Sequence, residues 1–261
     1  MPKIIAIANQ KGGVGKTTTA INFAASLAAA EKRVLLIDLD PQGNTTSGVG
    51  VDRRGLEATL YEVLIGKKTL KEVLVDTELP GMKLAPSRVD LIGAELELAD
   101  MDDRETALKR VIAPVEDEFD YILIDCPPSL GLLTLNGLTA ARSVLIPVQC
   151  EYYAMEGVSQ IWDTIARVQR SFNPDLEVEG ILLTMFDGRN NLCQQVVREI
   201  QGHFKELVFS SVIPRNITLG EAPSHGKPVI LYDITSRGAQ SYLALAKEVL
   251  RNEKKGVGPG A

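Results

Sequence analysis

A glycine-rich segment near the start of the sequence constrains the fold more than any other feature. It lies directly after an apolar run, Lys3–Ala8, and opens a stretch with helical spacing, Thr17–Ala30. In this context glycines let backbone N–H groups close around phosphates, and the helix N-terminus adds a favourable dipole. We expect a P-loop in which Lys16 reaches the β- and γ-phosphates of a nucleotide and the Thr17 hydroxyl ligates Mg²⁺. The nucleotide-binding segment is Lys11, Gly12, Gly13, Val14, Gly15, Lys16, Thr17 and Thr18.

The same segment departs from the standard P-loop pattern. That pattern has Gly where this chain has Gln10, and it has no requirement for Lys11. A solvated lysine is one interpretation of Lys11. The other is a second cation that serves a phosphate beyond the reach of Lys16, including one in a facing subunit, and this interpretation predicts a dimer.

Apolar runs alternate with segments of helical spacing along most of the chain. Runs rich in Ile, Val and Leu are typical of strands buried on both faces. The alternation predicts an α/β fold with a mostly parallel twisted sheet, helices on both faces and right-handed crossovers. The expected strands are Lys3–Ala8, Arg33–Asp38, Tyr121–Asp125, Val144–Val148, Gly180–Met185 and Val208–Ile213. The expected helices are Thr17–Ala30, Met155–Gln169, Leu192–His203 and Gly238–Asn252.

The 261 residues suffice for one domain with a full core, which we expect over residues 1–252. The stretch Leu56–Asp103 fits the alternation less well and is predicted to be α-rich, with a helix near Leu60–Leu64 and a short strand near Met82–Pro86. Its acidic run at 100–103 is interpreted as a solvated helix end. The Gly/Pro-containing residues 253–261 are predicted to form a flexible tail.

Charge and cysteine content narrow the class of protein. The first apolar run is too short for a signal peptide or a membrane span, so we expect a cytoplasmic protein. Three cysteines have neither the even count of a disulfide framework nor the spacing of a zinc site.

The net charge is −6, but residues 189–261 hold 10 Lys and Arg against 6 Asp and Glu, a net +4, and the remainder carries −10. A basic character therefore belongs to the last third.

Two further strand ends carry carboxylates. Asp38 and Asp40 follow the second apolar run, and either could hold the Mg²⁺ shell or position the attacking water. Asp125 ends the strand Tyr121–Asp125 as a lone acid, which is the geometry of a Walker B motif that contacts Mg²⁺ through water. Both lie where a parallel sheet places its ligand.

The identity of the base follows from an absence of guanine-reading residues. No Asn-Lys-x-Asp motif occurs, and the nearest variant, at 184–187, has Met185 in place of the lysine. The sequence therefore favours adenine and makes ATP the expected cofactor, together with Mg²⁺.

Six motifs together resemble the ParA/Soj family of chromosome-partitioning ATPases, over about residues 3–252. They are Lys11–Thr18, Asp38–Gly43, Asp125–Ser129, Gln149–Tyr153, Val212–Asn216 and Glu221–Pro228. The resemblance implies an ATP-dependent sandwich homodimer, with the fold of a P-loop NTPase of the deviant Walker A type. It also implies binding to double-stranded DNA without sequence preference, association with the nucleoid, and a ParB partner that stimulates hydrolysis.

The resemblance also implies roles for particular residues. Lys11 becomes the signature lysine that reaches across the dimer, Asp40 the hydrolytic carboxylate, and Pro214, Arg215 and Asn216 the adenine-side segment. Arg189 matches a family DNA-contact arginine. Close relatives often carry a second such arginine where this chain has Thr218. The DNA-binding face is expected to comprise Arg189, Arg198, Lys227, Arg237, Lys247 and Arg251.

Other protein classes share the deviant loop. A MinD-like regulator at a membrane surface needs a terminal amphipathic helix, and Tyr242, Leu243, Ala246, Val249 and Leu250 form an apolar stripe that would also suit a packed helix. A small-molecule ligase or amidotransferase needs a substrate pocket with further catalytic groups. A nitrogenase-like iron–sulfur reductase needs two spaced cysteines near the dimer axis, and Cys126 has no obvious mate.

Overall fold

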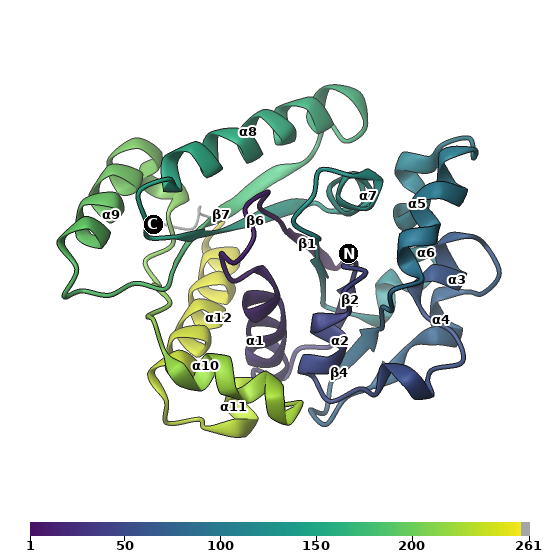
Figure 1. The fold of residues 1–261 in the computed structure, drawn as a ribbon, viewed down its shortest axis with the longest axis horizontal. Helices are drawn as coiled ribbons and strands as arrows, with labels where there is room; N and C mark the ends of the chain where they lie inside the picture. Colours follow the sequence, from purple (N-terminus) through teal and green to yellow (C-terminus); the bar gives the residue numbers. More distant parts are fainter. Residues whose placement is uncertain (257–261) are drawn as a thin grey trace.

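A seven-stranded sheet forms the centre of the computed structural model, which describes residues 1–256 (Figure 1). The strand order is β3-β4-β2-β5-β1-β6-β7, and every pair is parallel except β3 with β4. The strands are β1 (Lys3–Ile7), β2 (Val34–Asp38), β3 (Val75–Asp76), β4 (Met82–Ala85), β5 (Tyr121–Asp125), β6 (Ser143–Gln149) and β7 (Glu177–Thr184). The predicted α/β fold is thus confirmed.

Two hydrophobic clusters lie on the two faces of the sheet, because successive side chains of a strand point to opposite faces. Ile5 and Ile7 pack with α1 (Lys16–Ala29) and α12 (Arg237–Lys255). Ile4 and Ala6 pack in the other cluster, whose helices include α7 (Leu132–Ala140) and α8 (Ala154–Ser171). Figure 1 shows these two pairs of helices on opposite sides of the sheet. The remaining α-helices of the described residues are α2 (Asn44–Gly48), α3 (Leu60–Leu64), α4 (Leu70–Val73), α5 (Leu91–Ala99), α6 (Ala107–Ile112), α9 (Asn191–Phe204), α10 (Ile217–Glu221) and α11 (Val229–Tyr232).

One predicted strand, Val208–Ile213, is wrong. This segment runs beside β7 with an isolated bridge between Val208 and Ile181 and separate backbone hydrogen bonds from Phe209 to Ile181 and from Ile213 to Leu183, but it forms no continuous ladder. The backbone N–H groups of Ser210 and Ser211 donate to the carboxylate of Glu248 on α12, at 2.7 and 2.8 Å, and are therefore unavailable to a sheet ladder. The apolar residues on either side still pack in the core as an irregular edge.

Helix α12 crosses the predicted boundary at Asn252 and continues to Lys255. Its last turn is held because Glu253 accepts a hydrogen bond from the Tyr121 hydroxyl (2.5 Å) and pairs with Lys3 (3.1 Å). The rest of the predicted tail, residues 257–261, lies outside the described residues.

Candidate nucleotide-binding site

The glycine-rich segment connects β1 to α1 and leaves open space where a ligand can lie. Gly13 and Gly15 have φ angles of 77° and 88°, a region that favours glycine, and Gly15 is the N-cap of α1. A Cβ atom added to Gly12 or Gly13 would meet no atom within 4 Å. The loop therefore exposes backbone N–H groups and the start of a helix to an open cradle, which suits an anion such as phosphate.

Lys16 lies at the first position of α1 and its side chain turns back over the loop. Its Nζ donates to the carbonyl oxygen of Lys11 (3.1 Å), and the residue is buried. Burial lowers the pKa of Lys16, and the nearby Asp125, Cys126 and Asp40 oppose this shift. A cation held among desolvated acids is ready to bind a polyanion.

Asp125, at the end of β5, is fully buried, as is Asp38. Its Oδ2 accepts hydrogen bonds from Thr17 (2.9 Å) and Thr45 (2.6 Å), whereas its buried Oδ1 has no partner within residues 1–256. Burial raises the pKa of Asp125 to about 6. An unpartnered carboxylate oxygen beside a threonine hydroxyl fits the oxygen ligands that Mg²⁺ prefers.

Asp38 and Asp40 differ in what surrounds them. Asp38 Oδ2 accepts from the Thr46 backbone N–H (2.7 Å) and hydroxyl (2.6 Å), and Oδ1 accepts from the Asp40 N–H at 3.3 Å. Burial, reinforced by Asp125, raises the pKa of Asp38 to about 8. Asp38 thus holds α2 through Oδ2 and the Asp40 turn through Oδ1, so both oxygens are engaged and it is less free than Asp125 to approach a metal.

The Asp40 carboxylate keeps one oxygen without a bonding partner. Oδ1 accepts from the Gln42 N–H (2.9 Å), and within residues 1–256 no hydrogen bond reaches Oδ2. The Asp40 carbonyl accepts from the hydroxyl of Ser87 (2.8 Å), which follows β4. The turn is fixed at its backbone while a carboxylate oxygen stays available for a water molecule.

Lys11 binds within its own chain in this structure. Its Nζ pairs with Glu151, and the same ammonium lies 5.6 Å from the ring centre of Tyr153. Both side chains of the ion pair are about one-third exposed, so the pair is weak enough to exchange for another partner. Tyr152, Tyr153 and Leu130 are exposed large side chains near this position.

A cavity of about 250 Å³ adjoins the P-loop and is lined by the predicted adenine-side residues. Pro214, Arg215 and Asn216 form one wall, with Gly15 and Thr18 beside them. The sequence analysis had not assigned Thr184 to this site, but its hydroxyl donates to the Val14 carbonyl (2.8 Å) and joins β7 to the P-loop. The P-loop and this cavity are thus contiguous.

Arg189 lies in the loop before α9 with a side chain that is 91% exposed, and it pairs with Asp187 at 2.9 Å. This pairing lowers the pKa of Asp187 to about 2. The Asp187 carboxylate is therefore engaged by Arg189, not left free to read a guanine edge.

The other candidate DNA contacts are spread over several elements. Arg198 lies on α9, and Lys227 precedes α11 and pairs with Glu78 at 3.0 Å. Three more lie on α12: Arg237, Lys247 and Arg251. Figure 1 places α9, α10, α11 and α12 in the same half of the molecule.

Besides Thr184, sequence reasoning missed three residues that organise the site. Thr45 and Thr46 hold Asp125 and Asp38, and Ser87 holds the Asp40 turn and also donates its N–H to Thr46 (2.9 Å). The adjacent threonines shortly after the Asp-rich strand end, beyond residues 41–44, are a local signal that could have been read. Ser87 follows an ordinary short strand and carries no such signal.

Comparison with known proteins places this site in a family. The family model for an AAA domain matches residues 2–178. A chromosome partitioning protein ParA from Myxococcus xanthus is 57% identical over 96% of this chain and 89% of its own length. The sporulation initiation inhibitor protein Soj from Bacillus subtilis is 54% identical over 97% of this chain and 100% of its own.

A solved structure shares the fold over the whole chain. It is described as cobyrinic acid a,c-diamide synthase from Mycobacterium smegmatis with bound ADP and magnesium, and it is 42% identical with a TM-score of 0.87. The match covers 100% of this chain and 99% of that one. The relatives of higher identity, together with the P-loop that carries a second lysine, show that the chain belongs to the ParA/Soj family of chromosome-partitioning ATPases.

Proposed function

We propose that this chain is an ATP-dependent switch in DNA segregation. ATP and Mg²⁺ would pair two copies in a sandwich dimer that binds double-stranded DNA without sequence preference. A ParB-type centromere-binding partner would stimulate hydrolysis and release the DNA, so the protein would be cytoplasmic and associated with the nucleoid. The chain itself would hydrolyse ATP slowly.

The observation that carries this proposal is the unpartnered Oδ1 of Asp125 beside Thr17 and Lys16. A buried carboxylate oxygen without a hydrogen bond is costly unless a ligand completes it. Mg²⁺ held there would neutralise phosphate charge, and Thr17 and Asp125 would hold it, with Asp38 behind them. The similarly folded M. smegmatis protein was crystallised with ADP and magnesium, which supports the same ligands here.

Adenine is the proposed base. The 250 Å³ cavity beside Gly15 supplies Pro214, Arg215 and Asn216, while Asp187 is engaged by Arg189. Met185 occupies the position of a guanine-reading lysine. These features favour ATP over GTP.

Asp40 is proposed to position the water that attacks the γ-phosphate. Asp40→Ala should still bind ATP and dimerise, but its turnover should fall about 100-fold, because its free carboxylate oxygen is the one available to orient water. Phosphate release with and without the ParB-type partner measures the effect. Asp52→Ala, an exposed acid of the following turn, is the control. Normal turnover in Asp40→Ala would assign hydrolysis to another carboxylate.

Lys11 is proposed to leave Glu151 and complete the site of the facing subunit. Lys11→Ala should weaken the ATP-dependent dimer about tenfold or more, because a charge-assisted contact to phosphate is lost. Glu151→Gln removes the competing carboxylate and should leave the dimer at least as strong. Light scattering over a range of concentrations gives both results. An unchanged ATP-dependent mass for Lys11→Ala would show that this lysine stays in its own subunit.

The proposed function as a whole is tested by DNA retention with ATP, with ADP and without nucleotide. Retention on a DNA column only with ATP supports the segregation switch. Retention that does not depend on the nucleotide, or no retention at moderate salt, contradicts the proposed function. The net +4 of residues 189–261 supplies the charge for such binding.

The alternative of a MinD-like membrane-surface ATPase has less support. The α12 stripe that would lie on lipid instead packs in the core: Tyr242, Ala246 and Val249 are buried, and Leu243 and Leu250 pack against the same cluster. Among the helices of residues 1–256, none has the length and apolar character needed to cross a bilayer. Vesicle co-sedimentation that required ATP would favour this alternative.

A ligase or amidotransferase is the other alternative, because the M. smegmatis structure carries the description of an amide-forming enzyme. Such an enzyme couples ATP use to a small-molecule substrate. ATP hydrolysis that rises with DNA and the ParB-type partner, in the absence of any other substrate, favours the segregation switch.

A further inference from the structure

Helix α5 is apolar on two opposite sides, and only one of them is covered. Leu91, Ala94 and Leu98 are buried in the core. Val89, in the turn before the helix, and Ile92 and Leu96 on it have the same three- and four-residue spacing and are 68%, 54% and 74% exposed. We call these three residues the outer stripe. A helix with apolar residues on both sides is normally covered on both, so a contiguous exposed stripe marks an interaction surface.

The sequence segment that carries the outer stripe is acidic, and one arginine flanks it at each end, Arg88 and Arg104. Between Val89 and Asp103 the chain has no Lys or Arg, and it has six acids: Asp90, Glu95, Glu97, Asp100, Asp102 and Asp103. Asp100, Asp102 and Asp103 are exposed, which confirms the solvated acidic helix end expected from the sequence. An apolar stripe with an acidic rim is complementary to an amphipathic segment that carries Lys or Arg beside apolar side chains.

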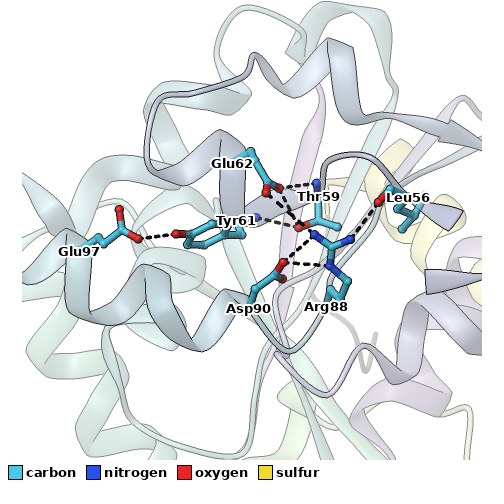
Figure 2. A network of polar contacts seen from close by, with 7 residues as sticks. All are labelled: Leu56, Thr59, Tyr61, Glu62, Arg88, Asp90 and Glu97. Carbon is cyan, nitrogen blue, oxygen red and sulfur yellow. Dashed lines mark hydrogen bonds and ion pairs between the residues drawn. The ribbon is translucent and has the colours of Figure 1, made fainter. Parts of the chain in front are cut away.

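The N-terminal end of α5 is braced to the rest of the molecule by a polar network (Figure 2). Arg88 binds Asp90 (2.6 Å), lies 4.0 Å from Glu62 and donates to the Leu56 carbonyl (2.9 Å). Tyr61 of α3 donates to Glu97. The outer stripe is therefore presented by a helix with a fixed position.

Helix α5 and the loop that leads into it contact both segments that flank the nucleotide site. Ser87, next to Arg88, donates to the Asp40 carbonyl. Glu95 of α5 accepts from the backbone N–H of Leu133 (3.3 Å), at the start of the helix that follows Asp125. Binding of a ligand to α5 would therefore be transmitted through these hydrogen bonds to the Asp40 turn and to the segment after Asp125.

We propose that the outer stripe is the docking site for a cationic amphipathic segment of the ParB-type partner that stimulates hydrolysis. This inference rests on the proposed function. Figure 1 shows α5 and α9 at opposite ends of the molecule, so a partner on α5 leaves the Arg189 side free for DNA. Repulsion disfavours a second copy of the chain as occupant, since a two-fold contact would set the acidic rims against each other.

The apolar part of the site is tested with the double variant Ile92→Ser/Leu96→Ser. Both side chains are exposed, so the fold should persist. The matched control is Ile234→Ser, an isoleucine that is 55% exposed outside this helix. Titration of the ParB-type protein from the same organism, with ATP present, should show about 30-fold or more loss of affinity for the double variant and none for the control. Basal ATP turnover, ATP-dependent mass and DNA retention should stay unchanged.

The acidic rim is tested with Asp100→Asn/Asp102→Asn. This variant should bind the partner about three- to tenfold more weakly at low salt and show a shallower salt dependence, because exposed charges are screened as ionic strength rises.

Three outcomes would overturn the inference. Unchanged partner affinity in both double variants would show that the segment docks elsewhere, while the proposed function stands. Loss of the ATP-dependent mass in Ile92→Ser/Leu96→Ser would mean that a second copy covers the stripe. A failure of the unmodified chain to bind the ParB-type protein would refute the partner in the proposed function as well, and that failure is visible before any variant is made.

Discussion

Lys16→Ala is expected to abolish productive ATP binding, with an affinity loss of about 10²- to 10³-fold and no measurable turnover. The Lys16 ammonium is a buried cation at the head of α1, with Asp125 and Asp40 near it. Without it, the triphosphate would enter a site whose nearest ionisable groups are carboxylates. Titration with a fluorescent ATP analogue and a phosphate-release assay measure the two effects.

The control for Lys16→Ala is Lys109→Ala, an exposed lysine on α6. The Lys16→Ala variant should fold, because burial already lowers the pKa of Lys16 and removal of the ammonium group relieves that desolvation cost. Thermal unfolding without nucleotide should therefore be close to that of the parent, while the stabilisation by ATP disappears. Undiminished ATP affinity and turnover would refute the assignment of Lys16.

The parts of the fold that the sequence predicted are those encoded by local pattern. The central strands are continuous apolar runs, and the long helices have a clear helical period, so each could be placed within a few residues. Val208–Ile213 has a similar composition, but the N–H groups of Ser210 and Ser211 in its middle bind Glu248, which is distant in the sequence. The two-residue strand β3 pairs with β4 through so few residues that no periodicity exists to be read.

The candidate site likewise consists of residues that local sequence pattern predicted and of contacts between residues far apart in the sequence. The P-loop residues are contiguous, so the glycine turn and the helix start at Lys16 could be predicted from their spacing. Thr45 meets Asp125 across 80 residues, and Lys11 meets Glu151 across 140, so neither contact follows from local spacing. The pairing of Lys11 with Glu151 adds a feature that the expected reach across the dimer did not include: the lysine must first leave a partner in its own chain.

Arg189→Glu is expected to abolish ATP-dependent DNA retention at moderate salt. The Arg189 side chain is almost fully exposed, and its bond to Asp187 is a weak surface ion pair, which a DNA phosphate can displace. Charge reversal places Glu beside Asp187 and turns this corner of each subunit acidic. Because ATP would pair two such corners, a dimer would lose two phosphate contacts at once, and its log–log salt slope should fall by about 2.

Two companion variants separate charge from structure in this prediction. Asp187→Asn frees Arg189 without moving it far and should retain DNA at least as well as the parent. Thr218→Arg supplies the second arginine found in close relatives and should strengthen retention, since Thr218 lies on α10 in the same half of the molecule. ATP binding and dimerisation should be unchanged in all three, because none of the three residues lines the P-loop or the adjoining cavity. If Arg189→Glu binds DNA as the parent does at moderate salt, the contact surface lies elsewhere, and the remaining basic residues of α9 and α12 become the candidates to test.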